Sequence, residues 1–168
     1  AVSPEWEINR NTPIEAVDAI LNLEPTIVRA DTALSEVVQA MLTQPGVHVV
    51  CVVNDDGRLV GVLDLHALAD DLFFHIMPEE FMSHVTDLEE AMHFAEMSGV
   101  RTAADAMHEP VWVKRGDKVK DAFKRMHKHG LQGLPVVDDL YRVTGYINLL
   151  ELAAVCLVQQ ADGSETAP

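Results

Sequence analysis

The chain contains one sequence pattern twice. The segment Glu24–Arg29 recurs as Glu109–Lys114, 85 positions later, and one extra residue in the first copy then reduces the offset to 84, at which Gly61 matches Gly145. A period this long indicates a small domain duplicated within one chain, because solenoid repeats are shorter and more numerous. Two units that bury similar apolar faces are expected to pack with pseudo-twofold symmetry and to form two related clefts.

Composition predicts an ordinary soluble protein. Of the 168 residues 48% are hydrophobic and 23% are charged, which is typical of globular domains. The apolar run Leu152–Val158 is too short for a membrane span, and the first residues lack the pattern of a secretory signal. Cys51 and Cys156 lie in apolar stretches without CxxC spacing, so we expect buried free thiols in a reducing compartment. These features favour a cytoplasmic location without membrane contact.

The charge distribution is uneven. A formal net charge of −15 argues against general nucleic-acid binding. Seven of the twelve basic residues nevertheless lie between Lys114 and Lys128. This stretch has two interpretations: the solvated face of one helix, or a local attractor for phosphates or for an acidic partner surface.

Each copy has the order strand, helix, strand, strand, helix. In both, a β-branched run, an apolar stripe at helical spacing and an Asp-rich turn mark the elements. The first copy is expected to have strands at 26–28, 47–53 and 59–63 and helices at 34–42 and 65–77. The second is expected to have strands at 111–113, 134–137 and 142–147 and helices at 119–129 and 149–158.

The predicted fold class is mixed α/β (α+β). We expect two pseudo-symmetric β-α-β-β-α units packed sheet to sheet, with helical segments before the first unit and between the units. The predicted divisions are an N-terminal helical segment at 1–24, a first unit at 25–77, a helical linker at 78–102, a second unit at 103–158 and a disordered tail at 159–168.

This order of elements resembles a tandem pair of CBS domains, also called a Bateman module. The second copy carries the resemblance in Gly133–Asp138 and Gly145–Leu152, and the first carries it in Val49–Val53 and Gly61–Leu68. The resemblance implies a non-catalytic regulatory module that binds an adenosine ligand, such as AMP, ADP, ATP or S-adenosylmethionine, in the cleft between the repeats. It requires no cofactor.

The resemblance places a ligand site in the second copy. In the family pattern, a hydroxyl residue and an acid three positions later hold phosphate and ribose; here Asn148 and Glu151 stand at those positions. A carboxylate accepts strong hydrogen bonds from ribose hydroxyls, and a helix N-terminus favours phosphate. The apolar slot for adenine is assigned to three residues and a phosphate contact to a fourth: Val111, Leu134, Pro135 and Lys114. Asn148 and Glu151 also have the form of a capping box, and both interpretations stay open.

A weaker second site is predicted in the first copy, at Thr26, Val50 and Asp64. There Asp64 would repel phosphate and Ala67 replaces the ribose-binding acid. The position of Asp64 favours a helix cap.

Catalytic and metal chemistry are not indicated. His66, His75, His84 and His93 recur every nine residues, a spacing that puts successive side chains on opposite helix faces. Neither a phosphate-binding glycine loop nor a catalytic motif is present.

The sequence also predicts a homodimer. The helix at 149–158 is apolar around its whole circumference, which requires burial on two sides. The function predicted is therefore adenosine-nucleotide sensing on behalf of a regulated protein. The alternative is an interaction or dimerisation domain whose nucleotide sites have decayed.

Overall fold

The computed structural model describes residues 8–44, 46, 48–70 and 99–165, with side chains in the last helix described as far as Leu157. The chain forms two compact units. The first-repeat unit is continuous, at 26–110, whereas the second-repeat unit combines 1–25 with 111–168. Each unit is described by itself below.

The first-repeat unit is built on a three-stranded sheet of order β1-β2-β3. Strand β1 (Thr26–Arg29) runs parallel to β2 (Val49–Val53), which pairs antiparallel with β3 (Leu59–Asp64). Helix α2 (Leu34–Thr43) connects β1 to β2, and α3 (Leu65–Asp70) follows β3 directly. The short helix α6 (Ala103–Ala106) contacts both α2 and β3. The apolar stripe of α2 is buried because its residues recur at helical spacing: Leu34, Val37, Val38 and Met41.

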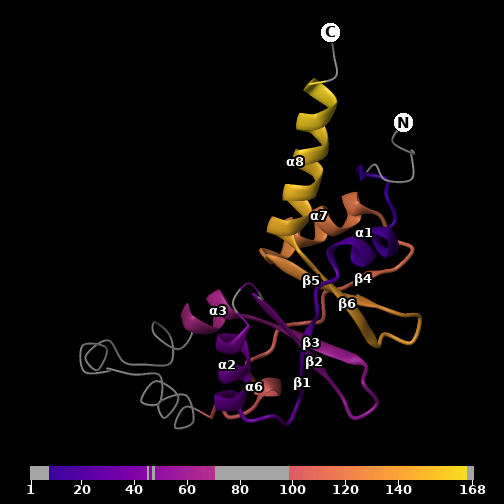
Figure 1. Cartoon of the computed structure of the whole chain (residues 1–168). Coiled ribbons are helices and arrows are strands. Elements are labelled where there is room, and N and C mark those ends of the chain that lie inside the picture. The colour runs from indigo at the N-terminus through magenta and orange to yellow at the C-terminus, as the bar shows by residue number, and fades with distance from the viewer. Residues whose placement is uncertain (1–7, 45, 47, 71–98, 166–168) are drawn as a thin grey trace, which may run out of the picture. The chain divides into compact units, whose positions relative to one another are not determined.

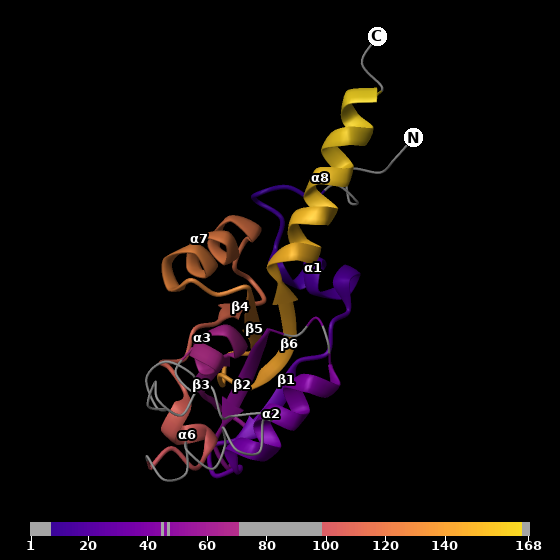
Figure 2. The same cartoon turned by 90° about the vertical axis from the view of Figure 1, so that its left-hand side faces the viewer.

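The second-repeat unit repeats this plan. Strand β4 (Val113–Lys114) is parallel to β5 (Gly133–Val137), which pairs antiparallel with β6 (Val143–Asn148). Helix α7 (Val119–His129) connects β4 to β5, and α1 (Ile14–Leu21) contacts β6. Helix α8 (Leu149–Glu165) continues from β6 and extends away from its sheet (Figures 1 and 2). None of the helices within the described residues has the length and apolarity needed to cross a bilayer.

The predicted class and the twofold β-α-β-β-α order are confirmed, but two boundaries differ. Helix α8 reaches Glu165, so most of the predicted disordered tail at 159–168 is helical backbone. Strand β4 is shorter than the predicted 111–113 strand and begins at Val113. Of the predicted helix at 65–77, residues 71–77 lie outside the described residues, as do 78–98 of the predicted linker.

Each repeat is completed by a segment that precedes the other repeat in the sequence. The Ile14 amide donates to the Asp117 carbonyl (2.7 Å), and the Val119 amide donates to the Thr12 carbonyl (3.0 Å). The first-repeat unit has the corresponding bonds: Ala103 amide to Thr32 carbonyl at 2.9 Å and Leu34 amide to Arg101 carbonyl at 2.9 Å. The two helical segments outside the repeats are therefore exchanged.

The exchanged segments explain the glycine in the third strand of each repeat. A Cβ on Gly145 would overlap the carboxylate of Asp18 from α1. A Cβ on Gly61 would lie 2.8 Å from the His108 carbonyl oxygen and would overlap the side chain of Met107. Real Cβ atoms do not approach other atoms this closely, so glycine lets the crossing segment pack onto the strand.

Candidate ligand site

Strand register brings most of the predicted second-copy site to one end of the β4-β5-β6 sheet. Gly133 pairs with Asn148, and Leu134 pairs with Ile147. Because β4 and β5 run parallel, Val111 lies at the same end as Leu134. Leu134 is fully buried and Val111 is 8% exposed. This end of the sheet therefore combines apolar side chains with the polar end of β6.

Asn148 and Glu151 stand at the junction of β6 and α8. Asn148 is the last residue of β6 and is 2% exposed, and Glu151 lies in the first turn of α8. The Oε2 atom of Glu151 is buried, and among the described residues it has no hydrogen-bond partner. A buried acceptor without a donor costs about 1–3 kcal/mol. A ligand that donated hydroxyl protons to this oxygen would recover that energy.

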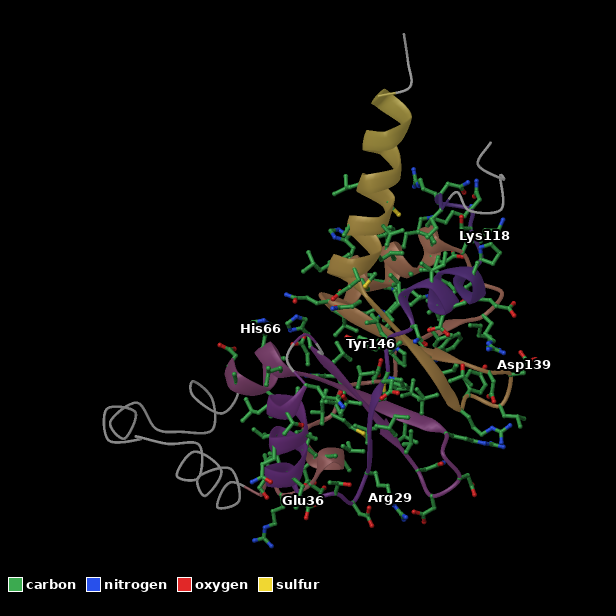
Figure 3. All side chains as sticks on the ribbon, in the orientation of Figure 1. Arg29, Glu36, His66, Lys118, Asp139 and Tyr146 are labelled. Atoms are coloured by element: carbon green, nitrogen blue, oxygen red, sulfur yellow. The ribbon has the colours of Figure 1, made fainter. Side chains whose placement is uncertain are left out.

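Tyr146 supports this region from the neighbouring strand position and was not identified from the sequence. Its side chain is 1% exposed, and a Cβ on Gly133 would overlap its hydroxyl. Figure 3 labels Tyr146 on β6. Gly133 and Tyr146 are diagonal neighbours, because Gly133 pairs with Asn148 and Tyr146 pairs with Pro135, so the contact becomes readable once the register is known.

Asp18 is a second residue that the sequence did not indicate. Burial raises the pKa of its carboxyl above the ordinary value, while the Tyr146 amide and Arg115 act in the opposite direction. The carboxylate lies against Gly145, next to Tyr146. The exchange of α1 onto β6 thus places an ionisable group close to the strand that ends in Asn148.

The first-repeat residues are also brought together, but their polar atoms have internal partners. Thr26 pairs with Val50 across β1 and β2, and the Thr26 hydroxyl donates to Gln44 Oε1 at 2.5 Å. The Oδ1 atom of Asp64 accepts from the amides of His66 (2.8 Å) and Ala67 (3.5 Å). Asp64 therefore caps α3, as its position predicts.

Lys114 is not brought together with the other predicted residues. It pairs with Val137, at the opposite end of the sheet from Asn148. Its ammonium lies 4.7 Å from the centre of the Tyr141 ring and 5.7 Å from that of Trp112. The sequence could not show that Lys114 lies away from the site, because strand register, which decides the end of the sheet at which a residue lies, is not known from the sequence.

Within the described residues no three His, Cys, Asp or Glu side chains are grouped so that they could hold a metal ion. His75, His84 and His93 lie outside those residues.

The chain belongs to the CBS domain family, whose model matches residues 17–73 and 103–157. Pairs of such domains are regulatory modules. The family match falls on both copies of the repeat, so the tandem arrangement expected from the sequence is confirmed.

Two solved structures and one characterised protein are similar to this chain. A CBS domain-containing protein from Thermotoga maritima is 26% identical, with a TM-score of 0.67 over 86% of this chain and 94% of that one. The CBS domain pair of protein MJ0100, in complex with 5′-methylthioadenosine and S-adenosyl-L-methionine, is 17% identical, with a TM-score of 0.63 over 89% and 98%. The choline transport ATP-binding protein OpuBA of Bacillus subtilis is 26% identical over 92% of this chain, which spans 34% of that protein.

Proposed function

We propose that the second-repeat unit binds an adenosine ligand and that the chain acts as a non-catalytic regulatory module. The observation that carries this proposal is the buried Oε2 atom of Glu151, which has no partner among the described residues. The adenosine compounds bound to the similar CBS pair of MJ0100 support the ligand class. For this chain the ligand would be AMP, ADP, ATP or S-adenosylmethionine.

Each residue at this end of the sheet has a distinct role in the proposal. Glu151 accepts hydrogen bonds from the ribose hydroxyls, which are charge-assisted and therefore strong. Asn148 contacts phosphate or ribose beside the N-terminus of α8, where free amides favour negative charge. The apolar slot for adenine is assigned to buried residues of the sheet: Val111, Leu134 and Pro135. Lys114 has no role here because it lies at the other end of the sheet.

The first repeat would bind more weakly. Thr26 and Asp64 already make internal hydrogen bonds, and Ala67 cannot replace the carboxylate that Glu151 provides. A ligand would have to displace existing bonds and would gain no charged partner for its ribose.

Calorimetry on two single variants tests this assignment. Loss of the charged partner in Glu151→Ala should cost about 1.5–3 kcal/mol, or roughly ten- to hundredfold in affinity for AMP. Asp64→Ala, at the junction of β3 and α3, is the matched control and should leave AMP affinity unchanged or improved. Equal losses in both variants would contradict the proposal.

We also propose a class for the protein that this module regulates. The resemblance to OpuBA supports a partner that, like OpuBA, is an ATP-binding transport protein.

The exposed face of α8 favours a second candidate function, homodimerisation. Leu150 is 73% exposed and Leu157 is 63% exposed, and apolar side chains of this size usually become buried when they form a patch. Light scattering at tens of micromolar protein should report a dimer that Leu150→Glu dissociates. Leu42→Glu, on the 60% exposed Leu42 of α2, is the control and should leave the dimer intact. A monomeric parent chain would contradict this function.

A further inference from the structure

The two hairpin turns share their hydrogen bonds and a position with positive φ, but a different residue occupies that position in each repeat. In the first repeat, the amides of Asp56 and Arg58 donate to Asn54 Oδ1, each at 3.0 Å. In the second, the amides of Leu140 and Arg142 donate to Asp138 Oδ1, each at 2.9 Å. Gly57 has φ +79°, and the corresponding residue of the second repeat, Tyr141, has φ +61°.

Tyr141 therefore occupies a backbone conformation that its own side chain disfavours. Left-handed φ values are tolerated by glycine and by asparagine, but they are unfavourable for an aromatic residue. Among the described residues, the other non-glycine residue with positive φ is Asn22, which ends α1. Backbone strain of this kind tends to persist where a side chain serves a function.

The strained conformation places the Tyr141 ring in an aromatic and cationic cluster. The ring meets Trp112 edge to face, with centroids 5.3 Å apart and planes at 70°. Lys114 Nζ lies over the Tyr141 ring, and the Arg125 guanidinium lies 5.4 Å from the centre of the Trp112 ring. Arg125 also donates to the Trp112 carbonyl (2.9 Å) and to Asp117 Oδ2 (2.7 Å). Lys114 of β4, Arg125 of α7 and Tyr141 of the β5–β6 turn thus hold the cluster in place.

The first repeat has no counterpart of this cluster. The positions equivalent to Trp112, Arg125 and Tyr141 are Ile27, Ala40 and Gly57. The two copies share the same order of elements, so the aromatic and cationic cluster is a feature of the second repeat alone. The cluster is not needed for the fold, because the first repeat forms the same sheet and turn without it.

The surface around the cluster is exposed and has a cationic helix beside it. Tyr141 is 40% exposed and Leu140 is 50% exposed. Two nearby cations are neutralised, since Arg125 pairs with Asp117 and Arg142 pairs with Asp138. Asp139 is labelled at the tip of the hairpin in Figure 3, where it adds one negative charge. In the described part of the chain, no ion pair engages Lys114 or the lysines of α7: Lys120, Lys124 and Lys128.

We propose that Trp112, Lys114, Leu140 and Tyr141 form a docking surface for an acidic peptide segment of a partner protein that carries an apolar anchor residue. Tryptophan, tyrosine and arginine are the residues most enriched where binding energy concentrates at interfaces. The aromatic rings and Leu140 would receive the apolar anchor. Lys114 and α7 would attract the acidic residues, against a chain whose net charge is −15.

The test uses a short fluorescein-labelled peptide in which glutamates flank a proline and a leucine. Fluorescence polarisation should report binding by the parent chain, and a peptide with lysines in place of the glutamates should not bind. Tyr141→Gly and Lys114→Gln should each weaken binding about tenfold or more. Ile27→Ala alters the first-repeat equivalent of Trp112 and should leave binding unchanged.

Tyr141→Gly is informative because it removes the ring and relieves the backbone strain together. Its melting temperature should equal or exceed that of the parent chain, so loss of peptide binding would not reflect unfolding. A Trp6→Phe background leaves Trp112 as the remaining tryptophan, and its fluorescence should change on peptide addition.

Three results would overturn the proposal. The first is peptide binding that Tyr141→Gly and Lys114→Gln leave unchanged. The second is displacement of the peptide by phosphatidylserine vesicles, which would identify a membrane-binding surface instead. The third is displacement by AMP, which would make the surface part of the nucleotide site. Saturating AMP should leave the peptide bound, so failure of the nucleotide proposal and failure of this one are distinguishable.

Discussion

The carboxylate of Asp18, in the helix that precedes the first repeat, lies directly against Gly145 in the last strand of the second repeat. The Tyr146 amide donates a hydrogen bond to this carboxylate. Sequence-distant parts of the chain therefore meet where a glycine leaves room for them, and the ionisable group at this contact makes it testable by substitution and by pH.

Gly145→Ala should destabilise the chain. The new methyl group would overlap the Asp18 carboxylate, and overpacking of this kind costs about 1–3 kcal/mol. Urea denaturation would measure the loss as a lower midpoint. Gly116→Ala is the matched control, because a Cβ at Gly116 has no heavy atom within 4 Å, and it should be neutral. Similar losses for both substitutions would argue against the contact.

Asp18→Asn should become more stabilising as the pH rises. Burial raises the pKa of Asp18 above 3.8 in the folded chain, so the folded state binds more protons than the unfolded state just above that pH. The stability contributed by this group therefore falls as the pH rises from 3.8 through the folded pKa, and then stays constant. Denaturation midpoints of the parent and the variant should diverge in favour of the variant over this range. Convergence would contradict the raised pKa.

Ligand binding should raise the melting temperature. At a free ligand concentration about a hundred times Kd, the folded state gains about 2.7 kcal/mol, which corresponds to roughly 5–10 °C for a chain of this size. We expect AMP, ADP or ATP to shift melting more than adenosine does, because the N-terminus of α8 beside Asn148 favours phosphate, and we expect salt to weaken the difference. Melting curves that stay unmoved with all three nucleotides and with S-adenosylmethionine would leave homodimerisation as the better supported function.

The two cysteines should differ in reactivity. Burial raises the pKa of the fully buried Cys51 to about 12, and it also raises the pKa of the half-buried Cys156. Because the thiolate is the reacting species, a thiol reagent at neutral pH should modify Cys156 first and leave Cys51 intact. Single Cys→Ala variants assign the two rates, and both thiols should react in denaturant. Faster reaction at Cys51 would contradict its burial.

The secondary structure of each repeat could be predicted because its signals are local. The valine run that became β2 and the apolar stripe of α2 are readable from spacing alone. Local signals do not fix every boundary. Proline is favoured at the first position of a helix, yet Pro13 precedes α1, because it is held in a bridge to Lys118, just before α7. That constraint comes from residues distant in the sequence, and propensity does not report it.

The candidate site was only partly predictable, because some of its signals are local and others depend on distant residues. Asn148 and Glu151 follow from a motif, whereas the place of Lys114 depends on strand register. The aromatic cluster was overlooked, although aligning the two copies places Tyr141 opposite Gly57, at a position that requires positive φ. An aromatic residue in a glycine position was the available signal.

The exchange of α1 and α6 has a consequence for the order of events during synthesis. The first-repeat unit is one continuous stretch, 26–110, whereas the second-repeat unit needs residues from both ends of the chain. On the ribosome, the first-repeat unit can close as soon as α6 has emerged. Helix α1 is made before the first repeat, yet it must wait for β6 before its apolar side can be covered. Translation therefore leaves helix α1 without its partner strand until the whole first repeat and most of the second have been made.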